Sequence, residues 1–224
     1  MINKSYPVFI DVDRTILSIN SGTSMILAAT REGILSYSQL FESLVLTILH
    51  RSHFITSETI ISRVARFFAG KSESVIADFS DRLFKDSLAH SIRPGALSAI
   101  EYHRGNNAEF VILSASTNYT CTPLLSELNI SNMLCTEMEI ENGIFTGKPE
   151  SGYCFGAEKL NRAAKFCNER GYQIKDAWYY GDSISDLPIL EAVGNPRCVV
   201  PDKKLRKIAK RRGWKIEEWE NPKH

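Results

Sequence analysis

Short apolar runs recur along the chain, and each of them ends abruptly in polar residues. Such runs, bounded by polar or turn-forming residues, are typical of buried strands in a parallel sheet. The clearest runs are residues 8–10, 110–113, 177–180 and 198–200. The polar residues that follow them are Asp11 to Asp13, Ser114 to Ser116, Gly181 to Ser183, and Pro201 with Asp202.

Apolar residues at helical spacing lie between these runs. In residues 160–170 they are Leu160, Ala163, Ala164 and Cys167, and Gly171 follows as a helix stop. Strands that alternate with helices predict an α/β sheet with right-handed crossover connections.

The first connection is much longer than a crossover requires. Residues 14–110 separate the first two predicted strands, whereas about 12 to 30 residues suffice for a crossover with its helix. Residues 24–88 have apolar positions at helical spacing and no strand-like alternation. We therefore predict a helical cap domain over residues 18–90, inserted into a catalytic core of residues 1–17 and 91–224. Two predicted helix stripes are Ile60, Val64, Phe67 and Phe68, and then Ile76, Phe79, Leu83 and Phe84.

A β-hairpin is predicted in the second half of the chain. Residues 137–140 and 144–146 flank Glu141, Asn142 and Gly143. Asn-Gly between two short apolar segments is a strong hairpin signal.

Composition limits the classes of function. The 224 residues are 43% hydrophobic and 24% charged, with a formal net charge of +1, which gives no reason to expect nucleic acid as a partner. The longest nearly apolar stretch, residues 44–49, is too short to span a membrane. The five cysteines have no metal-ligand spacing, and their odd number favours reduced thiols and a cytoplasmic location. The histidines are scattered, and we assign them no role.

Polar side chains, most of them carboxylates, follow the predicted strands. Asp11 and Asp13 follow the first strand, Ser114 follows the second, and Asp182 with Asp186 follows the third. Because sites in open α/β sheets form at the carboxyl ends of the strands, these side chains are expected to converge. Converging carboxylates need a cation, and a ligand set of oxygens alone suits Mg²⁺. Phosphoryl transfer needs such a cation and a nucleophile, which a carboxylate can provide.

The spacing of the first two aspartates suggests separate roles. Side chains two residues apart in an extended segment share a face. One of Asp11 and Asp13 can then attack phosphorus while the other reaches the leaving oxygen, and Asp13 could donate a proton to the leaving group and later accept one from water.

The order of these residues resembles the haloacid dehalogenase superfamily, in particular subfamily IB, its phosphoserine-phosphatase-like branch. Residues 11–15, DVDRT, match the first motif, DxDxT, and Ser114 closes the second. Lys159 matches the lysine of the third motif, and residues 181–186, GDSISD, match the fourth. The resemblance covers nearly the whole chain. It implies a Rossmann-like doubly wound parallel sheet with a type-1 helical cap inserted after the first strand.

The resemblance also implies a role for each residue. Asp11 would be the nucleophile, and Asp13 the acid and base that also binds Mg²⁺ through its backbone carbonyl. Asp11 and Asp182 would be direct metal ligands. Ser114, the backbone N–H of Ala115, and Lys159 would hold the phosphoryl group. The residues expected just behind the ligands are Thr15, Ser183 and Asp186.

Some positions depart from the family pattern. Arg14 replaces a small residue of the first motif, residues 18–22 lack the glutamate that binds the amine of phosphoserine, and Ser185 replaces an asparagine of the fourth motif. The last two differences argue against phosphoserine as the substrate. We name Arg14, Arg31 and Glu32 as candidates for substrate selection.

Two further segments have competing interpretations. Residues 203–212 carry seven positive charges; we favour an amphipathic helix with Leu205, Ile208 and Ala209 facing the core over an anionic-surface patch. Residues 40–55 are largely apolar, and we favour a role as core of the cap over a lipid-accepting pocket.

The favoured function is hydrolysis of a small-molecule phosphomonoester through an aspartyl-phosphate. The alternative is a lipid-phosphate phosphatase, of the lysophosphatidate or phosphatidylglycerophosphate type, which contacts a membrane peripherally. A phosphoserine phosphatase, a mutase and a catalytically silent sensor of a phosphorylated ligand are less favoured. The sequence does not indicate the oligomeric state.

Overall fold

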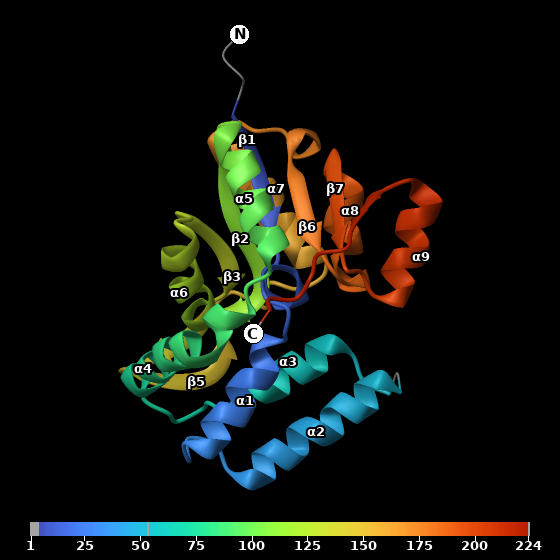
Figure 1. Ribbon diagram of the computed structural model, residues 1–224. Coiled ribbons are helices and arrows are strands. Elements are labelled where there is room, and N and C mark those ends of the chain that lie inside the picture. Colours follow the sequence, from blue (N-terminus) through green and yellow to red (C-terminus); the bar gives the residue numbers. More distant parts are fainter. Residues whose placement is uncertain (1–4, 53, 224) are drawn as a thin grey trace.

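A six-stranded parallel sheet forms the centre of the fold (Figure 1). The computed structural model describes residues 5–52 and 54–223. Every neighbouring pair of strands in this sheet is parallel. This confirms the predicted α/β class. In spatial order the strands are β3 (Asn132–Thr136), β2 (Ala108–Thr117), β1 (Tyr6–Ile10), β6 (Trp178–Gly181), β7 (Asn195–Val199) and β8 (Lys215–Glu217).

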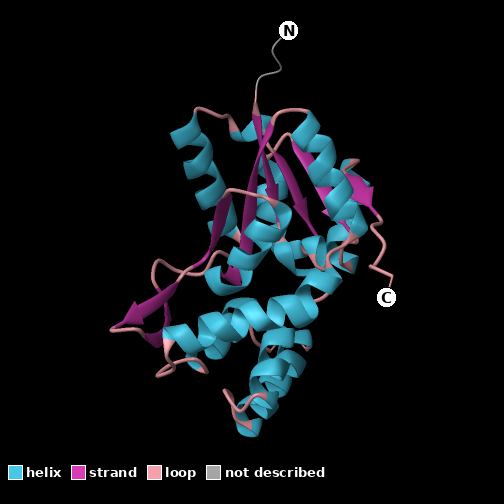
Figure 2. Ribbon diagram, turned by 60° about the vertical axis from the view of Figure 1, so that its left-hand side comes forward, coloured by secondary structure: helices cyan, strands magenta, loops and turns pink. Residues whose placement is uncertain are grey.

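Helices cover both faces of the sheet (Figures 1 and 2). Side chains of β1 alternate between the two faces, as in any strand. Val8 and Ile10 belong to the same apolar cluster as Ile100, whereas Phe9 packs in a second cluster with Phe166. The first face carries α5 (Pro94–Gly105) and α6 (Asn118–Leu128); the second carries α7 (Ala157–Arg170), α8 (Leu187–Ala192) and α9 (Lys203–Arg212).

The four predicted strands are present as β1, β2, β6 and β7, but β3 and β8 were not predicted. Both missed strands are short and lie at the edges of the sheet. Edge strands are only partly buried and do not need a continuous apolar run. The predicted helix at residues 160–170 is α7, which ends at Gly171 with a left-handed φ of 71°.

The segment from α1 to α4, which follows β1, is helical and lies beyond one end of the sheet (Figures 1 and 2). Its entry and exit run side by side: Leu17 and Ile92 form an antiparallel bridge, and Arg93 N–H donates to the carbonyl of Ile16 at 2.8 Å. The exact division into core and cap stays a prediction. The helices are α1 (Ser21–Arg31), α2 (Tyr37–Arg51), α3 (Ser57–Arg66) and α4 (Glu73–Leu83), followed by a π turn (Phe84–Leu88) and a 3₁₀ turn (Ala89–Ser91).

No described helix is both long and apolar enough to cross a membrane.

The predicted hairpin is confirmed as β4 (Met138–Glu141) and β5 (Ile144–Pro149). Asn142 and Gly143 both have positive φ, 51° and 76°, as a type I′ turn requires. Its contact with the helical segment was not predicted: the backbones of Gly70 and Lys71 pair with Phe145 at 2.8 and 2.9 Å. The hairpin therefore links the core to the helices that lie beyond the end of the sheet.

The two segments with competing interpretations have different outcomes. In α9, Leu205 and Ala209 are fully buried and Asp202 caps the helix, which fits the predicted amphipathic helix, whereas Ile208 is only half-buried. The prediction that residues 40–55 form cap core is wrong for much of α2. Leu46 is buried, but Phe41 is 69% and Ile48 63% exposed. The sequence of α2 is apolar around more of its circumference than its neighbours cover.

His103 of α5 is a fully buried polar residue against the sheet. Its ring nitrogens Nδ1 and Nε2 lie 2.9 Å from the hydroxyls of Tyr6 and Tyr180, respectively. The ring of Trp178 crosses it edge-on at a centroid distance of 4.5 Å. Burial, and secondarily the charge of Arg197, lowers the pKa of His103 to about 4.

We expect His103 to make stability depend on pH. The unfolded chain binds its proton near the usual pKa of about 6.5, so the folded protein loses stability as the pH falls from about 6.5 towards 4. His103→Phe should remove this term, so the stability difference between wild type and variant should shrink from pH 7 to pH 5. Urea unfolding at both pH values measures it. His90→Phe, at an exposed position, is the matched control, and a difference independent of pH would contradict the assignment.

Candidate active site

The site lies where the strand order reverses. The chain leads from β1 to β2 on one side, whereas β6 pairs with β1 on the other. Such a switch point leaves a crevice at the carboxyl ends of the two central strands. Asp11 directly follows β1 and Asp182 directly follows β6, so both carboxylates enter this crevice. The Asp11 N–H donates to the carbonyl of Tyr180 at 3.0 Å and continues the pairing of the two strands.

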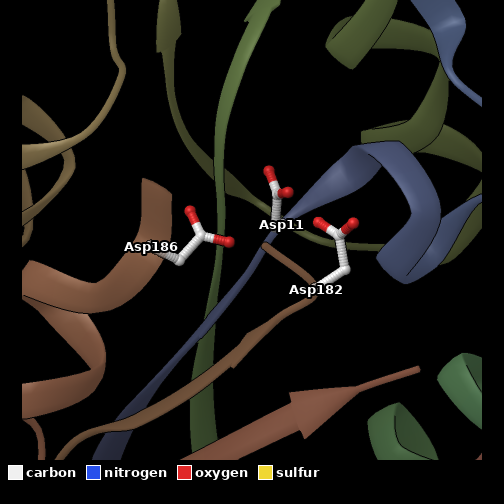
Figure 3. Close-up of side chains that lie close together, drawn as sticks. All are labelled: Asp11, Asp182 and Asp186. Carbon is white, nitrogen blue, oxygen red and sulfur yellow. The ribbon is translucent and has the colours of Figure 1, made fainter. Parts of the chain in front are cut away.

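Three carboxylates gather there (Figure 3). One carboxylate oxygen from each of Asp11, Asp182 and Asp186 lies within 4.8 Å of the other two. Asp186 comes from a 3₁₀ turn, Ile184–Asp186, just beyond β6. All three residues are buried. The structure therefore brings Asp186 into one cluster with Asp11 and Asp182, and its place behind the direct ligands stays a prediction.

Lys159 provides a positive charge inside this cluster. It lies in the first turn of α7, and its Nζ is 3.0 Å from Asp11 Oδ1 and 2.8 Å from Asp186 Oδ1. It also donates to the hydroxyl of Tyr179 at 3.1 Å. Burial favours the neutral amine, but Asp11 and Asp186 outweigh it and raise the pKa of Lys159 well above its usual value. The ammonium stays charged and leaves an excess of carboxylate.

Burial and the neighbouring negative charges raise the pKa values of two acids in the cluster, Asp11 and Asp182. Burial raises the pKa of Asp11 to about 7, against the lowering effect of Lys159 and with a further rise from Asp186. Burial and then Asp11 raise the pKa of Asp182 well above its usual value. Asp186 Oδ2 is buried and has no hydrogen-bond partner among the described residues. Clustered carboxylate oxygens with an unsatisfied lone pair fit a hard divalent cation such as Mg²⁺.

Gly181 makes this packing possible. A Cβ at this position would lie 2.5 Å from Asp186 Oδ2 and 2.6 Å from Tyr179 Cε1. Any larger residue would push the carboxylate or the ring of Tyr179 away from Lys159. The glycine of the fourth motif therefore has a steric reason here.

Asp13 is held apart from the cluster by the start of α1. Its Oδ1 accepts from Ser21 N–H at 2.7 Å, and its Oδ2 accepts from Asn20 Nδ2 at 3.0 Å. The chain turns sharply between Asp11 and α1, and Arg14 adopts a left-handed φ of 59°. Burial raises the pKa of Asp13, against the lowering effect of Ser21. A raised pKa is what a proton donor at neutral pH requires. The contact of its backbone carbonyl with a metal stays a prediction.

The last residues of β2, where its pairing with β3 is irregular, form the opposite wall. Ser114 is buried, and its Oγ accepts from Ser116 N–H at 3.2 Å. Thr136 donates its hydroxyl to the carbonyl of Ala115 at 2.8 Å and fixes this part of the strand. Ser114 and Ala115 line the same cavity as Asp11 and Lys159.

The remaining predicted residues are placed differently from one another. Arg14 and Ser183 line the cavity, and Thr15 is buried behind it. Arg31 and Glu32 do not: both are exposed at the end of α1, and Glu32 pairs with Arg82 at 2.7 Å on the outer surface. Our interpretation of Arg31 and Glu32 as substrate-selecting residues is therefore not supported, because the last turn of α1 points away from the crevice.

The family haloacid dehalogenase-like hydrolase matches residues 8–191. The chain belongs to this family.

Three similar proteins match nearly the whole length of this chain. A probable phosphatase of Mycobacterium tuberculosis is 26% identical over 217 residues, which are 96% of this chain and 75% of that protein. The solved structure of a Bordetella pertussis protein of unknown function superposes with a TM-score of 0.86 at 22% identity, over 96% of this chain and 99% of its own. A phosphoserine phosphatase, solved as an analogue of its phospho-aspartyl intermediate, superposes with a TM-score of 0.73 at 14% identity, over 97% and 95% of the two chains. Both solved structures therefore share the fold of this chain.

Several residues of this haloacid dehalogenase-like site were not predicted. Asn20 and Ser21 orient Asp13, Tyr179 accepts from Lys159, and Thr136 supports the end of β2 next to Ser114. Only Asn20 carried a visible signal, because asparagine is a preferred N-cap and here it caps α1 through Thr23 N–H at 2.9 Å. The others are ordinary strand and helix residues whose role depends on tertiary contacts.

We expect the contribution of the carboxylate cluster to the stability of the metal-free protein to fall as the pH rises from about 4 to about 7, opposite in sign to the contribution of His103. The folded pKa of Asp11 is about 7 and its unfolded pKa is near 4, so the folded state binds more protons within this window. Mg²⁺ should reverse the loss at pH 7.5 and raise Tm by roughly 5 °C. Calorimetry with chelator and with Mg²⁺ measures both effects.

Asp182→Asn isolates the cluster from His103, which acts in the opposite direction. This variant should flatten the decline in Tm between pH 4 and pH 7 and weaken the response to Mg²⁺. Glu101→Gln, on an exposed part of α5, should behave as wild type. Equal Mg²⁺ responses in wild type and Asp182→Asn would contradict a metal at this cluster.

Proposed function

We propose that this chain is a Mg²⁺-dependent phosphomonoester phosphatase that forms an aspartyl-phosphate on Asp11. The observation that carries the proposal is the buried Asp11 carboxylate, 3.0 Å from Lys159, with Asp13 facing the same cavity. The family is one of hydrolases, and the M. tuberculosis relative is named a probable phosphatase, which supports the same reaction class.

In the first step, a carboxylate oxygen of Asp11 attacks phosphorus while the ester P–O bond breaks. Lys159, together with Ser114 and the N–H of Ala115, would hold the phosphoryl oxygens and stabilise their developing charge. The leaving alkoxide takes the proton of Asp13 and departs as an alcohol. Burial raises the pKa of Asp13, which is the direction that a proton donor needs.

In the second step, water attacks the Asp11 phosphate, and Asp13 accepts the proton of that water. Inorganic phosphate leaves, and both carboxylates return to their initial states. Mg²⁺ held by Asp11, Asp182 and Asp186 would neutralise the phosphate charge and the excess carboxylate. Asn20 and Ser21 keep Asp13 facing the cavity between the two steps.

Phosphoserine fits the site less well. The phosphoserine phosphatase of similar fold is named for that substrate, but Asn20, Ser21, Gly22 and Thr23 form the part of this wall that follows the first motif, and none of them is acidic. The ammonium of phosphoserine would find no carboxylate there. The complete acid–lysine cluster also favours catalysis over a silent sensor.

Asp11→Asn should lower hydrolysis of p-nitrophenyl phosphate by at least about a thousandfold, because the amide is not a nucleophile. Release of inorganic phosphate, measured with Mg²⁺ present, also distinguishes hydrolysis from transfer to a second alcohol. Glu101→Gln is the control for substitution at an exposed acid. A fully active Asp11→Asn protein would disprove the nucleophile assignment.

Asp13→Asn should separate the two steps. Nitrophenolate is a good leaving group that departs without a proton, so this variant should still release one equivalent in a burst and then stall as phosphoenzyme. An alkyl phosphate, whose alkoxide needs the proton, should give no burst. Rapid-quench measurements with both esters test this, and steady turnover of the alkyl ester would contradict the role of Asp13.

A further inference from the structure

The cavity above Asp11 has two chemically different parts. It measures about 500 Å³, within the range of small-molecule pockets. Its floor, at the strand ends, is polar and charged. Its walls come mainly from α1, α2, α3 and the hairpin, and they are predominantly apolar. Representative wall residues are Met25, Ile26, Leu40, Val64, Phe68 and Phe145.

The helical walls offer little charge to a substrate. Among the described residues that line the cavity, those from residues 20–76 include no carboxylate, lysine or arginine, and His50 is the one with an ionisable side chain. An ammonium on the leaving group would lose hydration there and meet no carboxylate. A hydrocarbon would gain free energy from the same walls.

The apolar lining continues to the outer surface along α2. Leu44 lines the cavity and is also 53% exposed. The helix carries further exposed apolar residues at helical spacing on the same stripe, and α2 lies far from the sheet in Figure 1. These residues are Tyr37, Phe41, Val45 and Ile48. A chain longer than the cavity could therefore leave it at Leu44 without crossing a polar rim.

We propose that the site takes single-chain amphiphilic phosphomonoesters, with the phosphate on the charged floor and an uncharged hydrocarbon chain along α1, α2 and α3. This inference rests on the proposed phosphatase function and adds the substrate class. The wall accounts for the preference, because the floor binds the phosphate that all phosphomonoesters share.

The test is a series of n-alkyl phosphates from ethyl to decyl, each below its micelle concentration. All have the same primary alkoxide as leaving group, so only the apolar contact changes. We expect kcat/KM to rise about fourfold for each methylene that reaches the wall, and then to level off when the chain reaches Leu44. Phosphoserine and glycerol phosphate should be poor substrates. A flat series, or a preference for either polar ester, would overturn the proposal.

A matched pair of variants tests where the hydrocarbon chain of the substrate lies. Val64→Thr keeps the shape of a wall residue but adds a hydroxyl, so the ratio of kcat/KM for octyl phosphate to that for ethyl phosphate should fall about tenfold. Val75→Thr makes the same change on α4 outside the lining and should leave the ratio unchanged. An unchanged ratio in Val64→Thr would overturn the placement of the chain, and the wild-type series decides the substrate class even if this variant does not fold.

Two further measurements ask whether the substrate comes from solution or from a bilayer, and whether a negative result contradicts the substrate class or the phosphatase function. Lysophosphatidate is presented dissolved in water or embedded in phosphatidylcholine vesicles; hydrolysis from either source supports the proposal, and hydrolysis from neither overturns it. Phe41→Ser, on the exposed stripe of α2, should slow only the vesicle reaction if the chain enters from a bilayer. Hydrolysis of ethyl phosphate without a chain-length effect refutes the substrate class alone, whereas no hydrolysis of any ester with Mg²⁺ refutes the proposed function.

Discussion

Lys159 lies 3.0 Å from Asp11 and 2.8 Å from Asp186, and all three side chains are buried at the floor of the cavity. Burying charge is costly unless each group is paired, and a single ammonium cannot pair with three carboxylates. The free energy that folding loses here is recovered when a proton or a cation joins the cluster. The same imbalance is the reason to propose a divalent ion at this site.

The topology explains why the acids meet at this point. Strands β1 and β6 are neighbours in the sheet although most of the chain lies between them, so the residues after each strand share one crevice. Local features then refine the arrangement. Gly181 leaves room for the carboxylate of Asp186, and the left-handed turn at Arg14 directs the chain so that Asp13 meets Ser21. Each of these features acts on a carboxylate through its neighbours.

The sequence predicted four of the six strands of the sheet, the hairpin and the acids that follow β1 and β6, because apolar runs, an Asn-Gly turn and strand-terminal acids are local patterns. It did not predict β3 or β8, which are short strands of five and three residues at the edges of the sheet. It placed Arg31 and Glu32 at the site and residues 40–55 in the core, because helical spacing does not say which face meets a neighbour. The hydrogen bonds of Ser21 and Tyr179 depend on residues distant in the sequence.

The charged floor and the apolar walls act on opposite halves of one ester. Contacts to the phosphate are common to all phosphomonoesters, so they contribute to rate but do not discriminate among substrates. Discrimination in the proposed reaction must therefore come from the walls. A hydrocarbon wall gains only a modest amount for each methylene, but it disfavours a charged leaving group strongly because the lost hydration is not replaced. In the proposed reaction, the helical insertion would thus select mainly by exclusion, while the residues at the strand ends would carry out the chemistry.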